Sequence, residues 1–218
     1  MAIITGLKSI KKVQESKPKT DDSPRARWLK IEDGQSVKVR FVNELDPDSP
    51  NYDSKRGLAI VVAEHTNPKD YRRKAVCTMD DEGRCFGCEQ YRKDPKSGWK
   101  ARLRFYINAL VDDGNEKYVA VWSQGVSSKS PTTTMLIEYA GDTNSISNLQ
   151  WRLKRSGTGT QTSYALIPLA TDSEPFDWNT VDVFDLEKVA IRTLSYPDQE
   201  AFYMGVDIDT ESTSSVEW

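Results

Sequence analysis

Apolar and polar residues alternate along much of the chain, a pattern typical of half-buried β-strands. The alternation is clearest over residues 36–41, and the continuous apolar run 58–63 predicts a more buried strand. Polar segments that contain glycine, such as 112–115, separate neighbouring strands in the manner of hairpin turns. Many short strands joined by such turns favour an all-β sandwich or barrel. The remaining expected strands are residues 28–31, 101–111, 117–123, 134–139, 149–155 and 163–169.

Helix is expected in only two places, over residues 183–194 and residues 145–151. Both ends of the chain are polar and predict flexible arms, because such a composition cannot bury enough apolar surface to hold a fixed structure. We therefore divide the chain into a basic N-terminal arm (1–24), a core (25–205) and an acidic C-terminal tail (206–218).

The strand pattern is interrupted over residues 65–100, a charged segment that contains the only histidine and all three cysteines. Cys85 and Cys88 form a C-x-x-C turn, which directs two thiolates to one ion, and the glycine between them permits the tight backbone. With His65 and Cys77 they complete a Cys₃His set, a known composition of closed tetrahedral zinc sites. The sequence therefore predicts one structural Zn²⁺, held by these four residues within an inserted subdomain.

Other chemistries for the cysteines fit the sequence less well. A thioredoxin-like redox pair belongs in a βαβ context, which the strand pattern lacks. A catalytic zinc deaminase carries H-x-E followed by P-C-x-x-C, whereas here Thr66 and Asn67 follow the histidine and an arginine precedes Cys85. We therefore expect a binding protein and not an enzyme. A zinc-dependent enzyme acting on nucleic acid and a zinc-ribbon protein adaptor remain as alternatives.

Charge is unevenly distributed behind a net charge of −3. Residues 1–100 hold 21 Lys and Arg against 16 Asp and Glu, whereas residues 171–218 hold 2 against 12. The acidic total therefore does not argue against a nucleic-acid partner, which responds to the local field of one surface. The chain shows neither an apolar run near the roughly 20 residues that span a bilayer nor a secretory signal at its start, so we expect no membrane association.

Basic and aromatic residues interleave around the insertion and in the strand that follows it. Alternation in residues 101–111 turns the apolar residues inward and Arg102, Arg104 and Tyr106 outward. By the same reasoning, the tyrosine and the tryptophan of residues 117–123 face outward. Outward rings beside arginines provide stacking platforms in a basic groove, which is how proteins hold single strands without base readout; the alternative is that these rings pack beneath another segment. The predicted DNA contacts are Tyr71, Arg72, Arg73, Lys74, Tyr91, Arg92, Trp99, Lys100, Arg102, Arg104, Tyr106, Tyr118, Trp122, Arg152 and Lys154.

The order of the four metal ligands, followed by Arg-Phe-Tyr-Ile-Asn-Ala-Leu-Val at residues 104–111, resembles the T-even-type phage single-stranded DNA-binding protein (helix-destabilising protein) family. The likeness covers residues 28–170 and extends loosely to both arms. It implies an OB-type β-barrel with an inserted zinc subdomain and flexible N- and C-terminal arms. It also implies a role in DNA replication, recombination and repair in the cytoplasm of the infected bacterial host, with Tyr106 stacking on bases and the N-terminal arm mediating self-association. The arm departs from the family in having no compact Lys-Arg-Lys cluster.

The acidic tail suggests a second partner. We expect it to compete with single-stranded DNA for the basic groove, because a tethered anion acts at high effective concentration. When DNA displaces it, its final aromatic residue is expected to dock into a replication or recombination protein. The alternative is an acidic end that only aids solubility. The residues assigned to this role are Asp207, Asp209, Glu211, Glu217 and Trp218.

Overall fold

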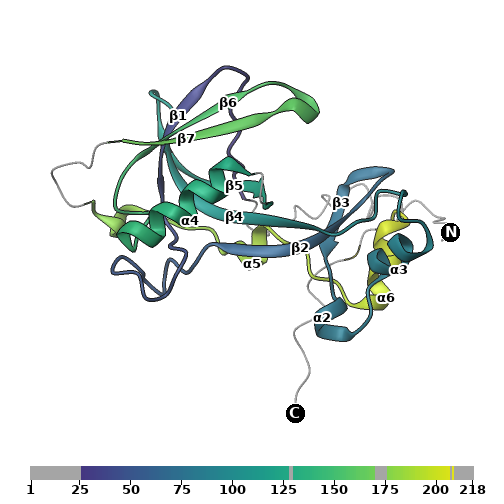
Figure 1. Ribbon diagram of the computed structural model, residues 1–218. Helices are drawn as coiled ribbons and strands as arrows, with labels where there is room; N and C mark the ends of the chain where they lie inside the picture. The colour runs from purple at the N-terminus through teal and green to yellow at the C-terminus, as the bar shows by residue number, and fades with distance from the viewer. Residues whose placement is uncertain (1–25, 128–129, 170–175, 207, 209–218) are drawn as a thin grey trace, which may run out of the picture.

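The computed structural model describes residues 26–127, 130–169, 176–206 and 208 (Figure 1). The predicted N-terminal arm therefore lies outside the described residues. The same holds for the residues assigned to partner binding, which are Asp207, Asp209, Glu211, Glu217 and Trp218.

Seven strands form one antiparallel sheet, which confirms the mainly β class. The strands are β1 (Ser36–Phe41), β2 (Ile60–Asn67), β3 (Asp70–Val76), β4 (Arg102–Asp112), β5 (Lys117–Gly125), β6 (Trp151–Ser156) and β7 (Ser163–Pro168). The helices are α2 (Met79–Glu82), α3 (Phe86–Lys93), α4 (Pro131–Thr143), α5 (Leu186–Val189) and α6 (Tyr196–Tyr203), with short 3₁₀ turns at Gly159–Gln161 and Trp178–Thr180.

The long strand β4 organises the sheet because it pairs with three others. β5 lies along one edge of β4, whereas β2 and β1 share the other edge, β2 at its first half and β1 at its second. β3 continues from β2, and β6 and β7 continue from β1. The sheet thus fans into two parts (Figure 1). We call β1, β5, β6, β7 and α4 with the second half of β4 the sheet lobe, and residues 64–100 with 192–206 the cysteine lobe.

The sheet is open and not closed into a barrel. Among the described residues no backbone ladder joins β5 to β7, the strands that a closure would bring together. Their side chains meet instead, with the ring centroids of Trp122 and Tyr164 6.4 Å apart. The sheet therefore curls around a shared core without hydrogen-bonded closure.

Helix α4 lies across this opening and replaces the strand expected over residues 134–139. Pro131 occupies the first turn, where its fixed φ favours a helix start, and Asn144 ends the helix in the left-handed conformation. Leu136 is buried in the core, and the Tyr139 ring meets Trp151 at 4.9 Å. The apolar residues of this segment have high β-propensity, but tertiary packing decides in favour of the helix.

The two helices expected from the sequence are also largely absent. Residues 145–151 wrap around Glu44, a buried carboxylate that accepts hydrogen bonds from the Ser145 hydroxyl at 2.7 Å and the Ile146 N–H at 3.0 Å. Because the Ile146 N–H bonds to this side chain, it does not make the backbone hydrogen bond that a helix would require. Of residues 183–194 only the short helix α5 forms.

The main core fills the inside of the curled sheet. It is one cluster of buried side chains from all parts of the sheet lobe, centred on residues such as Phe41, Ile107, Trp122, Trp151 and Leu153. None of the helices in the described ranges is long and apolar enough to span a bilayer.

Candidate metal centre and nucleic-acid surface

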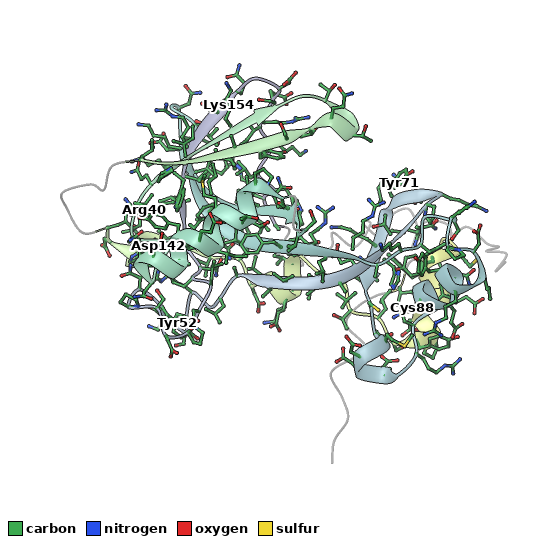
Figure 2. The ribbon with its side chains drawn as sticks, viewed as in Figure 1. Arg40, Tyr52, Tyr71, Cys88, Asp142 and Lys154 are labelled. Carbon is green, nitrogen blue, oxygen red and sulfur yellow. The ribbon has the colours of Figure 1, made fainter. Side chains whose placement is uncertain are left out.

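The four predicted metal ligands converge in the cysteine lobe. His65 lies near the end of β2, Cys77 directly follows β3, and Cys85 and Cys88 lie at the start of α3. Figure 2 labels Cys88 in this lobe. The ligand atoms of the four residues all lie within 4.8 Å of one another. Cys88 Sγ is 3.5 Å from Cys77 Sγ and 3.4 Å from His65 Nε2. A tetrahedral ion with metal–sulfur bonds of about 2.3 Å requires sulfurs about 3.8 Å apart, so the cluster could hold a metal ion with little rearrangement.

The histidine ring is oriented for ligation by its own surroundings. Its Nδ1 lies 2.6 Å from the Trp99 carbonyl oxygen, which can only accept, so Nδ1 carries the proton and Nε2 keeps its lone pair toward the sulfurs. Gly87 packs against the same ring: a Cβ there would lie 2.3 Å from His65 Cγ. Only glycine permits this approach of α3 to β2.

Trp99 thus orients the histidine of the candidate metal centre through its backbone carbonyl. Its half-buried ring packs in the apolar cluster of the cysteine lobe, 4.8 Å from the Tyr203 ring. The Tyr203 ring of α6 covers one side of the Trp99 ring, and the predicted DNA contact of Trp99 stays a prediction.

The three thiols differ in acidity. Burial alone would raise the pKa of Cys85, but the contact with the His65 side chain and hydrogen bonds from the backbone N–H groups of Cys88 and Thr78 outweigh it and lower that pKa to about 6. Burial and the contact with Cys77 raise the pKa of Cys88 to about 12, and burial also raises the pKa of Cys77. A bound cation stabilises all three thiolates, so ion binding displaces protons from this cluster. Four protein ligands complete a tetrahedron and leave no position for a reacting water, which suits a structural role.

Along β4 the two faces alternate as predicted from Phe105 onward, but Leu103, expected inside, is 50% exposed, and Tyr106, expected outside, is buried. It is completely buried beneath Trp28, whose ring centroid lies 6.0 Å away, and beside Leu186 and Ala190 of the α5 segment. Its hydroxyl donates to Glu64 at 2.6 Å. The prediction that Tyr106 stacks on bases is wrong in this structure, because residues far away in sequence cover it.

The phase predicted for β5 is reversed. Trp122 stands directly opposite Ile107 and Tyr118 opposite Val111, and directly paired residues share one face of a sheet. Both rings therefore turn to the core, where Trp122 is 2% exposed and stacks on Phe41 at 5.8 Å. Tyr118 is half-buried against the same core. Neither is an outward stacking platform.

Basic residues gather on the outer face around the buried carboxylate of Glu64. Lys74 Nζ and Arg104 Nε lie 3.8 and 3.7 Å from its oxygens, and burial lowers the pKa of Lys74 despite this carboxylate. Trp28 is 37% exposed and its ring lies 5.7 Å from Lys74 Nζ. Strand alternation adds Arg72 and the exposed Arg102 to the same face. We call Trp28, Arg72, Lys74, Arg102 and Arg104 the outer cationic surface.

Trp28 belongs to the short predicted strand 28–31, but it is not among the functional candidates that the sequence indicates. A parallel bridge to Val121 holds Trp28 beside β5, and the Leu29 N–H donates to the Val121 carbonyl at 2.9 Å. The segment thus places one ring over Tyr106 and beside the cations. No local sequence signal reveals this pairing, because it joins residues about ninety positions apart.

Other predicted DNA contacts are dispersed. Arg73 donates to the carbonyls of Phe202, Gly205 and Val206 and so serves the end of α6. Tyr71 is 78% exposed at the β2–β3 hairpin. Three further residues lie on the cysteine lobe, namely the half-buried Tyr91 and the exposed Arg92 and Lys100.

Arg152 and Lys154 are exposed on β6, beside Lys38 and Ser36 of β1. Figure 2 shows Lys154 on the sheet lobe and Tyr71 on the other lobe. The predicted contacts therefore divide between separate surfaces instead of lining one groove.

Comparison with protein-family models, with curated proteins and with solved structures gives no significant match. These comparisons identify no family for the chain.

Proposed function

We propose that the protein binds single-stranded DNA without sequence preference and acts in phage DNA replication, recombination and repair. In this proposal the Cys₃His cluster holds Zn²⁺ as a structural ion, because three thiolates and one imidazole are a composition that zinc favours. The curled sheet is interpreted as an OB-type barrel that is left open, since Trp122 and Tyr164 bring its two ends together. The protein is a binding module and not an enzyme.

The observation that carries the proposal is the half-exposed ring of Trp28 next to the cations of the outer cationic surface. Four cations there, Arg72, Lys74, Arg102 and Arg104, face two carboxylates, Glu64 and Asp70. The surplus positive charge attracts phosphates, and an exposed indole provides a platform for an unpaired base. Bases in a duplex are already stacked and cannot use the ring, so the surface favours single strands.

In this proposal both terminal arms contact protein partners. The acidic tail, with Trp218 at its tip, would dock a replication or recombination protein, and the basic N-terminal arm would mediate self-association along a strand. Both would act in the cytoplasm of the infected bacterial host.

Replacement of Trp28 tests the proposal. Stacking on one base contributes about 1–3 kcal/mol, so Trp28→Ala is expected to weaken binding of a labelled oligothymidine roughly 5- to 140-fold in an anisotropy titration. Affinity of the unaltered protein should fall steeply with salt and greatly exceed that for duplex of the same length.

Trp178→Ala is the matched control, because this ring also packs on an arginine, Arg56 at 4.2 Å, but lies away from the outer cationic surface. Its affinity should equal that of the unaltered protein. Equal affinity of the unaltered protein for duplex and single strand would refute the function. Unchanged affinity of folded Trp28→Ala would refute this surface as the site.

A further inference from the structure

Helix α6 packs against the metal-binding loops although it contributes no ligand. Figure 1 shows α6 beside α3 in the cysteine lobe, more than a hundred residues further along the chain than the cysteines. The Val76 N–H also donates to the Arg192 carbonyl at 2.9 Å, so the approach to α6 is tied to the end of β3.

Gln199 on α6 bridges the two loops that carry the cysteines. It is 1% exposed, and its Oε1 accepts the Phe86 N–H at 2.9 Å while its Nε2 donates to Thr78 Oγ1 at 2.9 Å and to the Leu194 carbonyl at 3.2 Å. Thr78 directly follows Cys77, and Phe86 directly follows Cys85. The amide therefore fixes the distance between two ligand-bearing loops.

Tyr203 makes the third connection. Its hydroxyl donates to the backbone carbonyl of His65 at 3.1 Å, and its own carbonyl accepts from Asn67 Nδ2 at 2.8 Å. The segments that carry all four ligands are thus hydrogen bonded to one eight-residue helix. None of these bonds belongs to the ion itself, yet each is satisfied only when the ligand-bearing loops are in place.

The apolar cluster around α6 is small. The buried cluster of this lobe has five members, Ala75, Phe86, Leu194, Phe202 and Tyr203. If the ligand loops separate, Gln199 loses two of its three partners, the Phe86 N–H and the Thr78 hydroxyl, and an unsatisfied buried amide is costly. Docking of α6 and closure of the loops therefore depend on each other.

We propose that Gln199 and Tyr203 are positioning residues for the metal ion and that ion binding and α6 docking form one cooperative unit. In this proposal, loss of the ion releases residues 192–206 from the ligand-bearing loops. Because coupling is reciprocal, a docked α6 also raises the affinity for the ion. This inference concerns any ion held by the cluster and does not depend on DNA binding.

Metal affinity tests the coupling. Gln199→Leu keeps the side-chain volume and removes all three hydrogen bonds, and Tyr203→Phe removes one hydroxyl. Supporting partners of metal ligands typically contribute 10–100-fold to affinity, so Gln199→Leu is expected to lose metal to a competing chelator at 10–100-fold lower chelator activity. Tyr203→Phe should show a smaller loss, and Gln161→Leu on the exposed turn of the sheet lobe should show none.

Two further readouts separate coupling from general instability. Co²⁺-loaded Gln199→Leu should retain the absorption of a tetrahedral three-thiolate site, since every ligand remains. In the unaltered full-length protein, chelation should speed hydrogen exchange over residues 196–203 while β4 to β6 stay protected. Unaltered metal affinity of Gln199→Leu, or full protection of α6 after chelation, would overturn the inference; if Gln199→Leu does not fold, the exchange measurement on the unaltered protein decides.

Discussion

The two lobes of this protein are held together in different ways. The sheet lobe buries fifteen apolar residues in one cluster, whereas the cysteine lobe buries five in its own. A cluster of five buried residues is too small to stabilise the cysteine lobe by apolar burial alone. The lobe is therefore expected to depend on the Cys₃His cluster and on hydrogen bonds from α6. Side chains of the first lobe could be exchanged for others of similar volume, but the second depends on particular atoms at particular positions.

The largest effect is expected when one metal-ligating sulfur of the cysteine lobe is removed. Cys85→Ser removes a ligand with the lowest pKa of the three thiols and leaves an incomplete tetrahedron. Structural zinc contributes about 10–16 kcal/mol to small zinc domains, so the variant should bind no stoichiometric metal and the cysteine lobe should lose its hydrogen-exchange protection. The sheet lobe should keep its protection. Unfolding of both lobes together would show that they are one cooperative unit, and it would contradict the claim that the two lobes are stabilised independently.

A smaller effect is expected in the core of the sheet lobe. Trp151 is fully buried, contacts Phe41 and Tyr139, and donates its indole N–H to the Ile146 carbonyl at 3.0 Å. Trp151→Ala should lower the free energy of unfolding of this lobe by about 3–5 kcal/mol in a denaturant titration. Metal content at low denaturant should stay unchanged. Loss of metal in the still-folded variant would mean that the cysteine lobe relies on the sheet core.

Features set by residue identity could be predicted from the sequence. One histidine and three cysteines in a short segment admit few arrangements, and the cluster forms as expected. The alternation of residues 36–41 coincides with β1, because its apolar positions all belong to one face.

Features set by distant partners could not be predicted. β5 carries apolar or aromatic residues on both faces, so alternation alone left its phase open, and only the register with β4 turns Trp122 inward. Tyr106 is in the predicted phase, but Trp28 and α5 cover it from sites about eighty residues away on either side. The sequence pattern defines the faces of a strand but does not show which face another segment covers.

The measurement that most directly tests the difference between the lobes is the metal content of natively purified protein by elemental analysis, combined with a thiol count. The account predicts one zinc per chain and three thiols that react only after the metal is removed. A fully folded, metal-free protein with Cys85 and Cys88 joined in a disulfide would contradict it.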